Sequence, residues 1–277
     1  MNGVVADTKR VQWVRAWPDD ERPEFRIGRS GDDLIAEWVG FATLRSNRSG
    51  TRAEYRVDDP CASPEIVEKV GRGQVRALLG HLQGKLSFHG AAAAIDGNAF
   101  LILGGSGAGK SSTAAALCAL GLADFVADDT APVEIRDGSA WIDRVEADHW
   151  LPDDTARALG HGPSGSRFKQ RLAPPSSTQK ATRLITIVKL EFDDDLSHPS
   201  VRQLAGQEVF HALTTSMLRF VLDEAAVALR DFEQLTSLAT IVPVFELKRP
   251  RGIESLEKNC TVILGLVENR ARTGGAL

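Results

Sequence analysis

A glycine-rich run in the middle of the chain has the residue types that bind the phosphates of a nucleotide. The run GGSGAGKS, from Gly104 to Ser111, matches the pattern G-x-x-x-x-G-K-[ST] in full. Its glycines let successive backbone N–H groups turn toward an anion, and a following helix adds the positive end of its dipole. Lys110 would reach the β- and γ-phosphates, and the Ser111 hydroxyl would be a ligand of Mg²⁺, which prefers oxygen. The residues expected to bind the nucleotide are Gly104, Gly105, Ser106, Gly107, Ala108, Gly109, Lys110, Ser111 and Ser112.

Two adjacent aspartates could act on a nucleotide bound there. Asp128 and Asp129 come directly after a short apolar segment. A strand that ends with them would bring their carboxylates to the edge of the sheet where open α/β folds bind ligands. One carboxylate could hold Mg²⁺, and the other could accept the proton of an attacking hydroxyl group. The alternative is a turn in which Asp129 caps the chain that follows.

A histidine and a basic run are further candidates. His89 begins the strand next to the one that leads into the glycine-rich run, where it could orient an aspartate, contact phosphate or be purely structural. Arg167, Lys169 and Arg171 lie in a segment rich in Ser and Pro. They could close over a transferring phosphate or hold an acidic peptide, and the alternative is a solvated basic loop.

Turn signals and periodicity predict the elements that position these residues. Asp96-Gly97 indicates a tight hairpin between the apolar runs 89–95 and 99–103, the second of which leads into the glycine-rich loop. A helix is expected from Lys110 until Gly121 ends it. This strand–loop–helix context disfavours a chance match of the motif. The acidic pair Asp153-Asp154 is expected in a solvated loop. Further strands are predicted at 125–127, 133–135, 140–142, 184–192 and 241–247, and further helices at 206–222, 229–239 and 253–269.

The first part of the chain has a different character. Short aromatic or β-branched pieces at 11–14, 25–27, 34–41 and 55–57 predict strands, and residues 64–84 predict a helical connector. We therefore expect a small front module over residues 1–84, β-rich with that helical part, and one α/β catalytic domain over residues 85–277. The catalytic domain would hold a mixed sheet with flanking helices.

Composition excludes several classes of protein. The chain has 277 residues, a formal net charge of −4 and a sequence pI near 5.9, which disfavours a dedicated nucleic-acid binder. No apolar stretch is long enough for a membrane helix, and the start lacks the apolar core of a secretory signal. The three cysteines have neither metal-ligand nor disulfide spacing. These features favour a cytoplasmic protein without nucleic-acid or membrane partners.

The combination of His89-Gly90, a hairpin, GGSGAGKSS and then FVADD resembles the catalytic domain of HPr kinase/phosphorylase. The match is specific over residues 86–135 and extends more weakly to about residue 260. The resemblance implies ATP and Mg²⁺ as cofactors, and transfer of the γ-phosphate to a serine of a peptide or small protein. It implies Asp128 as the base toward the serine hydroxyl, with support from His89 and Asp129. It further implies that Ser111 and Asp129 are ligands of the metal ion.

Two segments of that family have no counterpart here: its glutamate-bearing signature after the acidic pair, and its late Pro-Gly-Arg-Asn type loop. What remains is similar to shorter HPr kinase-like proteins, some of which belong to lasso-peptide clusters and phosphorylate a serine of a precursor peptide. A homo-oligomer remains open. The alternatives are a small-molecule kinase and a regulatory module that senses nucleotides without transferring phosphate.

Overall fold

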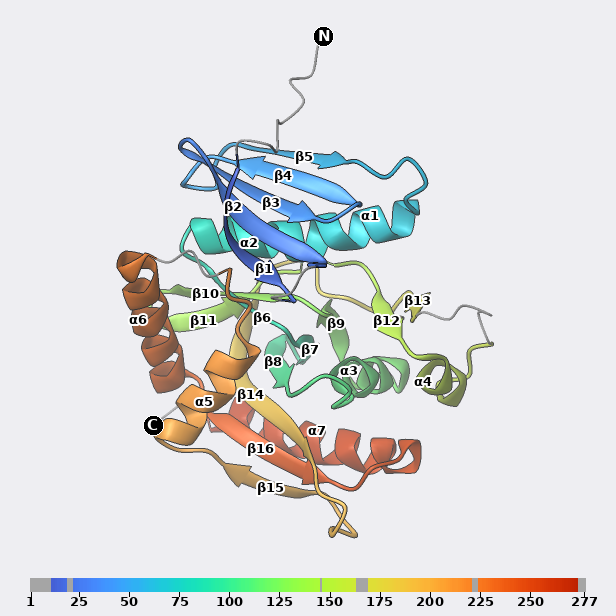
Figure 1. The fold of residues 1–277 in the computed structure, drawn as a ribbon. Coiled ribbons are helices and arrows are strands. Elements are labelled where there is room, and N and C mark those ends of the chain that lie inside the picture. The colour runs from blue at the N-terminus through green and yellow to red at the C-terminus, as the bar shows by residue number, and fades with distance from the viewer. Residues whose placement is uncertain (1–10, 19–21, 145, 163–168, 221–223, 274–277) are drawn as a thin grey trace. The chain divides into compact units, whose positions relative to one another are not determined.

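The computed structural model describes residues 11–18, 22–144, 146–162, 169–220 and 224–273. The chain divides into two units (Figure 1). The first consists of Met1–Lys85 and Arg219–Asp231, and the second of Leu86–Leu218 and Phe232–Leu277. The sequence prediction places Arg219–Asp231 in the second domain, whereas the structure groups this segment with the front unit.

The front unit contains a five-stranded antiparallel sheet in which each strand pairs with the next along the chain. Its strands are β1 (Gln12–Trp17), β2 (Phe25–Ser30), β3 (Asp33–Trp38), β4 (Ala42–Ser46) and β5 (Ala53–Val57). The predicted strand over 34–41 ends at Trp38, because Gly40 has a φ of 74° and turns the chain into β4. The expected β-rich character of the front part is confirmed.

The helical connector follows β5 in the same unit. It consists of α1 (Pro64–Val70), the π-helical turn η2 (Gly71–Val75) and α2 (Arg76–Leu82). The π-helical turn contains Gly71 and Gly73, the two residues that weaken the helical pattern in the sequence. The helical prediction for 64–84 is thus confirmed, with an irregular turn where the glycines lie.

The second unit is built on a mixed sheet. Its main path runs β6–β10–β11–β14–β8–β7–β9, and β16 and β15 extend it from β14. Its strands are β6 (Leu86–Phe88), β7 (Ala91–Ile95), β8 (Asn98–Leu103), β9 (Asp124–Ala127), β10 (Ala131–Arg136), β11 (Ser139–Ile142), β14 (Thr182–Phe192), β15 (Ser200–Gln203) and β16 (Val244–Arg249). The mixed sheet and its predicted strands are confirmed, while β6 and β15 have no counterpart in the sequence prediction.

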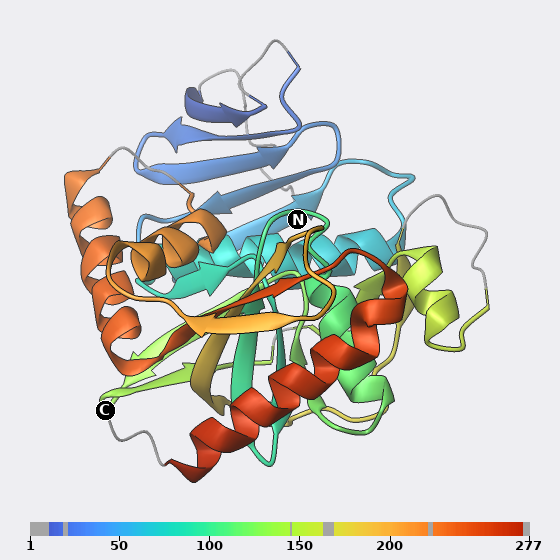
Figure 2. The same ribbon diagram turned by 90° about the horizontal axis from the view of Figure 1, so that it is seen from below.

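Helices cover both faces of this sheet and close two hydrophobic cores (Figure 2). One core contains residues of α3 (Lys110–Ala119) and α7 (Leu256–Arg272), which pack against each other. The other contains residues of α5 (Gln207–Ser216) and α6 (Ala225–Ile241). None of the described helices is long and apolar enough to span a bilayer.

The strand directions place the candidate functional residues at one edge of the sheet. Strands β14, β8 and β16 are parallel, so their carboxyl ends lie at the same edge. Strand β7 runs antiparallel to both β8 and β9, so it begins where those two strands end. The loop after β8, the aspartates after β9 and the histidine before β7 therefore meet at this edge.

Three local predictions need correction. Helix α5 ends at Ser216 rather than at 222, because Met217 is extended and forms a β-bridge with Phe88. Asp153 and Asp154 lie in the first turn of α4 (Asp153–Ala158), where acidic side chains favour the helix dipole, and not in a loop. A small two-stranded antiparallel sheet of β12 (His149–Leu151) and β13 (Gln170–Leu172) was not expected, since each strand has only three residues.

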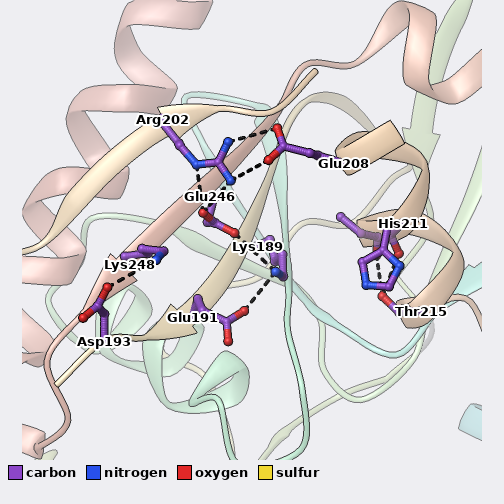
Figure 3. A network of polar contacts seen from close by, with 10 residues as sticks. Lys189, Glu191, Asp193, Arg202, Glu208, His211, Thr215, Glu246 and Lys248 are labelled. Carbon is purple, nitrogen blue, oxygen red and sulfur yellow. Dashed lines mark hydrogen bonds and ion pairs between the residues drawn. The ribbon is translucent and has the colours of Figure 1, made fainter. Parts of the chain in front are cut away.

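A ladder of charged side chains crosses the sheet near α5 (Figure 3). Glu246 on β16 is 6% exposed and lies between Lys189 on β14 and Arg202 on β15. Its carboxylate accepts from Lys189 Nζ at 3.3 Å and from Arg202 Nε at 2.9 Å. Arg202 also donates to Glu208 of α5 at 2.9 Å. Glu246 thus links three strands, and through Arg202 the first turn of α5.

Replacing Glu246 by alanine is expected to lower the free energy of unfolding by about 2 kcal/mol, because Lys189 loses a buried partner. Urea unfolding would measure the change. The matched control is Glu191→Ala, since Glu191 also pairs with Lys189, at 2.9 Å, but is half exposed. An exposed pair contributes less than about 1 kcal/mol. Equal losses in the two variants would show that burial of Glu246 does not matter.

Candidate active site

The glycine-rich loop lies between β8 and α3, as the sequence predicts. Gly104, Gly107 and Gly109 have φ angles of 146°, 75° and 80°, which side chains other than glycine rarely adopt. A Cβ on Gly104 would also approach Leu190 O to 2.8 Å. No side chain caps α3 among the described residues, so the N–H groups of its first turn remain available to an anion. The loop has the backbone form that phosphate binding requires.

Lys110 lies at the start of α3 and is only 7% exposed. Its ammonium group donates to Gly104 O and Gly105 O, each at 3.0 Å. Burial lowers the pKa of Lys110, and the carboxylate of Asp129 opposes that shift. The cation is therefore held against the loop by main-chain carbonyls and lies in the field of the acidic pair.

A cavity of about 370 Å³ opens beside the loop. Its lining residues come from the loop, from the ends of neighbouring elements and from the segment before β13. They are His89, Ser106, Gly107, Gly109, Lys110, Ser111, Ser112, Asp129, Pro152 and Lys169. One space thus brings together residues of the glycine-rich loop, a histidine, a carboxylate and a second lysine.

His89 and Asp129 contact each other at this cavity. His89 Nδ1 lies 3.1 Å from Asp129 O and 3.3 Å from Asp129 Oδ1. Because a carbonyl oxygen can only accept, Nδ1 carries the hydrogen, which leaves a lone pair on Nε2 of the neutral ring. Burial, followed by the charge of Lys110, lowers the pKa of His89, which favours the neutral ring. Asp129 has a φ of 70°, a conformation that aspartate tolerates better than most residues.

Asp128 has a different environment from its neighbour. It is completely buried, and its carboxylate accepts from the main-chain N–H groups of Asp129 at 3.0 Å and Trp150 at 2.9 Å. The Ser111 hydroxyl also hydrogen-bonds to it. Asp128 does not line the cavity. The two aspartates therefore have different partners: Asp128 is hydrogen-bonded to Ser111, and Asp129 contacts His89.

Burial raises the pKa of Asp128 to about 6, against an ordinary value of 3.8. The ionised carboxylate therefore lowers stability when no cation is bound, and this cost grows as the pH rises from about 4 to above 6. In EDTA, the free energy of unfolding of Asp128→Asn relative to that of the wild type is expected to be higher at about pH 8 than at about pH 4.5. Urea unfolding of both proteins at each pH measures this difference. A difference that does not change with pH would contradict the burial cost.

The residues of the basic run do not lie together in the structure. Lys169 lines the cavity. Arg171, on β13, forms an ion pair with Asp148 at 2.6 Å and does not belong to the cavity lining. Arg167 lies outside the described residues. Of the two predicted cations that the structure describes, Lys169 is the one beside the glycine-rich loop.

Sequence reasoning missed three buried groups around the site. Glu146 accepts from the N–H of Asp128 at 3.1 Å, and His149 Nδ1 lies 3.9 Å from Asp128 Oδ2. Burial lowers the pKa of His149 to about 4, so this ring is neutral. Arg249, at the end of β16, donates to Ala108 O inside the loop. A search for polar residues at strand ends would have found Arg249, but its charged neighbours Lys248 and Arg251 suggest a surface turn.

The donor set fits Mg²⁺ held together with phosphate. No group of three His, Cys, Asp or Glu side chains that could hold a metal occurs within the described part of the chain. Ser111 and Asp128 would supply two adjacent oxygen ligands, and Mg²⁺ commonly takes one or two protein oxygens together with substrate phosphates and water. The raised pKa of Asp128 agrees with a carboxylate that a cation would stabilise.

Comparisons with known proteins find similar chains among the solved structures. No family model matches the sequence, and no curated protein matches it. Among solved structures, the chain is similar to the HPr(Ser) kinase/phosphatase from Coxiella burnetii, with 13% sequence identity and a TM-score of 0.38. The match covers 69% of this chain and 99% of that one. The function is therefore inferred from the geometry of the site itself.

Proposed function

We propose that the chain is an ATP- and Mg²⁺-dependent phosphotransferase that transfers the γ-phosphoryl group to a serine hydroxyl of a peptide or small protein. One observation carries the proposal: the phosphate loop with Lys110 and the His89–Asp129 pair line the same cavity. An anion-binding loop alone would suit a nucleotide sensor. A carboxylate that faces the same space adds the group that a transfer to a hydroxyl requires.

The loop and the start of α3 would bind the triphosphate. The main-chain N–H groups of the loop and the Lys110 ammonium would neutralise the β- and γ-phosphates. Ser111 and Asp128 would hold Mg²⁺, which supplies further positive charge to the phosphates when bound. Lys169, which also lines the cavity, would add a second cation beside the transferring group.

Asp129 would accept the proton of the acceptor. As the serine oxygen attacks the γ-phosphorus, the bond to the β–γ bridging oxygen breaks, ADP leaves and the hydroxyl proton passes to Asp129. His89 would orient that carboxylate through its Nδ1–H. This reverses the roles implied by the sequence resemblance, in which Asp128 is the base and Asp129 holds the metal. Asp129 lines the cavity through which an acceptor would enter, whereas Asp128 is buried and hydrogen-bonded to Ser111.

The resemblance of the motifs to HPr kinase-like proteins supports serine as the acceptor. It is also the support for a ribosomally made precursor peptide, such as that of a lasso peptide, as the substrate. A test is incubation of the protein with Mg·ATP and a library of serine-centred peptides, followed by mass spectrometry. A phosphorylated peptide whose alanine-centred version is not modified supports the proposal. Phosphate found only on added sugars or nucleosides, or ATP bound without turnover, would contradict it.

A further inference from the structure

Arg249 reaches the phosphate loop from inside the protein. It is the last residue of β16, which is parallel to β14. Arg249 therefore lies at the same sheet edge as the loop. The side chain is inward, because Arg249 is 4% exposed. Its guanidinium Nη2 donates to the carbonyl oxygen of Ala108, two residues before Lys110. A residue distant in the sequence thus contacts the main chain of the loop.

The guanidinium also occupies the space behind the turn at Gly109. This glycine has a φ of 80° and begins α3 as its N-cap. A Cβ built on Gly109 would lie 2.5 Å from Arg249 Nη2. Loop and arginine therefore fit each other closely. The hydrogen bond takes up the Ala108 carbonyl, and Arg249 itself is not among the residues that line the cavity.

The positive charge of Arg249 has no acidic partner among the described residues. Within that part of the chain its Nε has no hydrogen-bond partner, and burial lowers the pKa of Arg249 with no carboxylate opposing the shift. The Phe192 ring, whose centroid is 4.7 Å from the guanidinium carbon, covers one side of the group. Arginine stays charged even when buried, so this arrangement is costly unless an anion lies nearby. The phosphates proposed for the loop would be that anion.

We propose that Arg249 is a positioning residue for nucleotide binding: its hydrogen bond fixes the Ala108 carbonyl of the loop, and its buried charge attracts the phosphates bound there. The inference rests on the proposed function, because it requires phosphate in the loop. It goes further by assigning an internal cation, distinct from Lys110 and Lys169, to the binding of the triphosphate. Its contribution should appear in ground-state binding and not in proton transfer.

The test compares Arg249→Met with Arg251→Met. Arg251 is the matched control, because its guanidinium carbon lies 4.4 Å from the centroid of the same Phe192 ring but the side chain is 65% exposed. Inorganic tripolyphosphate with Mg²⁺ is the probe, since it reports on the phosphate subsite without a base. Calorimetry is expected to show an affinity about tenfold weaker for Arg249→Met and unchanged for Arg251→Met. For transfer from ATP, KM should rise and kcat should stay within about threefold.

Thermal unfolding without ligand separates this role from simple structural support. A purely structural arginine would lower the melting temperature of the ligand-free protein and leave the affinity of the folded fraction unchanged, and that result would overturn the inference. Should Arg249→Met not fold, Arg249→Gln, which keeps a donor but no charge, must meet the same criteria. A wild type that does not bind tripolyphosphate would overturn the proposed function as well. Binding by the wild type with unaffected Arg249 variants would overturn this inference alone.

Discussion

Replacing Lys110 by methionine is expected to abolish phosphoryl transfer, with a fall of at least about 10²- to 10³-fold in kcat/KM. The ammonium group lies at the loop, held by Gly104 O and Gly105 O, and is the cation closest in sequence to the Ser111 hydroxyl. Methionine preserves the length and burial of the side chain but removes the charge that would neutralise the phosphates. The Kd for Mg·ATP, measured by displacement of a fluorescent nucleotide, should rise as well.

Lys258→Met is the control for loss of one positive charge, because Lys258 is an exposed residue of α7. It should leave both transfer and binding unchanged. Unaltered transfer by the Lys110 variant, with wild-type affinity for Mg·ATP, would mean that the glycine-rich run does not bind the triphosphate in the way proposed. Circular dichroism of both variants establishes that they are folded.

Replacing Asp129 by asparagine is expected to lower kcat by about 10²- to 10⁴-fold, the usual contribution of a general base, while Mg·ATP binding stays within a few-fold. The amide can still accept from His89 but cannot take up the serine proton. The measurement is the initial rate of peptide phosphorylation together with the Kd of Mg·ATP. If Asp129 is the base and Asp128 a metal ligand, this variant must lose phosphoryl transfer while it retains Mg·ATP binding.

Asp128→Asn provides the matched comparison. Because the Asp128 carboxylate is hydrogen-bonded to Ser111, the other proposed Mg²⁺ ligand, its loss should raise the Mg²⁺ concentration needed for half-maximal rate. Saturating Mg²⁺ should then restore a large part of the rate. If Asp128→Asn abolished transfer at saturating Mg²⁺ while Asp129→Asn retained it, the base would be Asp128, as the sequence resemblance implies.

Local signals in the sequence were sufficient for the centre of the site. The eight-residue motif specifies its own strand–loop–helix context, because the glycines are needed at positive φ and the following alanines favour a helix. The hairpin at Asp96-Gly97 was equally readable, since both residues have positive φ, at 49° and 74°, as a tight primed turn requires. Each of these features depends on a few consecutive residues.

Features that depend on tertiary contacts could not be read in this way. Asp128 and Asp129 are neighbours of the same type, and their different environments follow from the φ of 70° at Asp129 and from partners 17 to 40 residues away. Helix α5 stops early because Met217 bridges to Phe88, 129 residues before it in the chain. Arg249 contacts Ala108 across 141 residues. A single sequence carries no signal for any of these pairings.

The most direct test of the central claim is a calorimetric titration of the wild-type protein with ATP, with and without Mg²⁺. The account predicts one site per chain, an affinity that falls when EDTA removes Mg²⁺, and displacement of the nucleotide by tripolyphosphate. It further predicts that Lys110→Met shows little binding under the same conditions. Absence of binding to the wild type, or binding that neither Mg²⁺ nor Lys110 influences, would contradict the assignment of this cavity as the site of a Mg·ATP-dependent phosphotransferase.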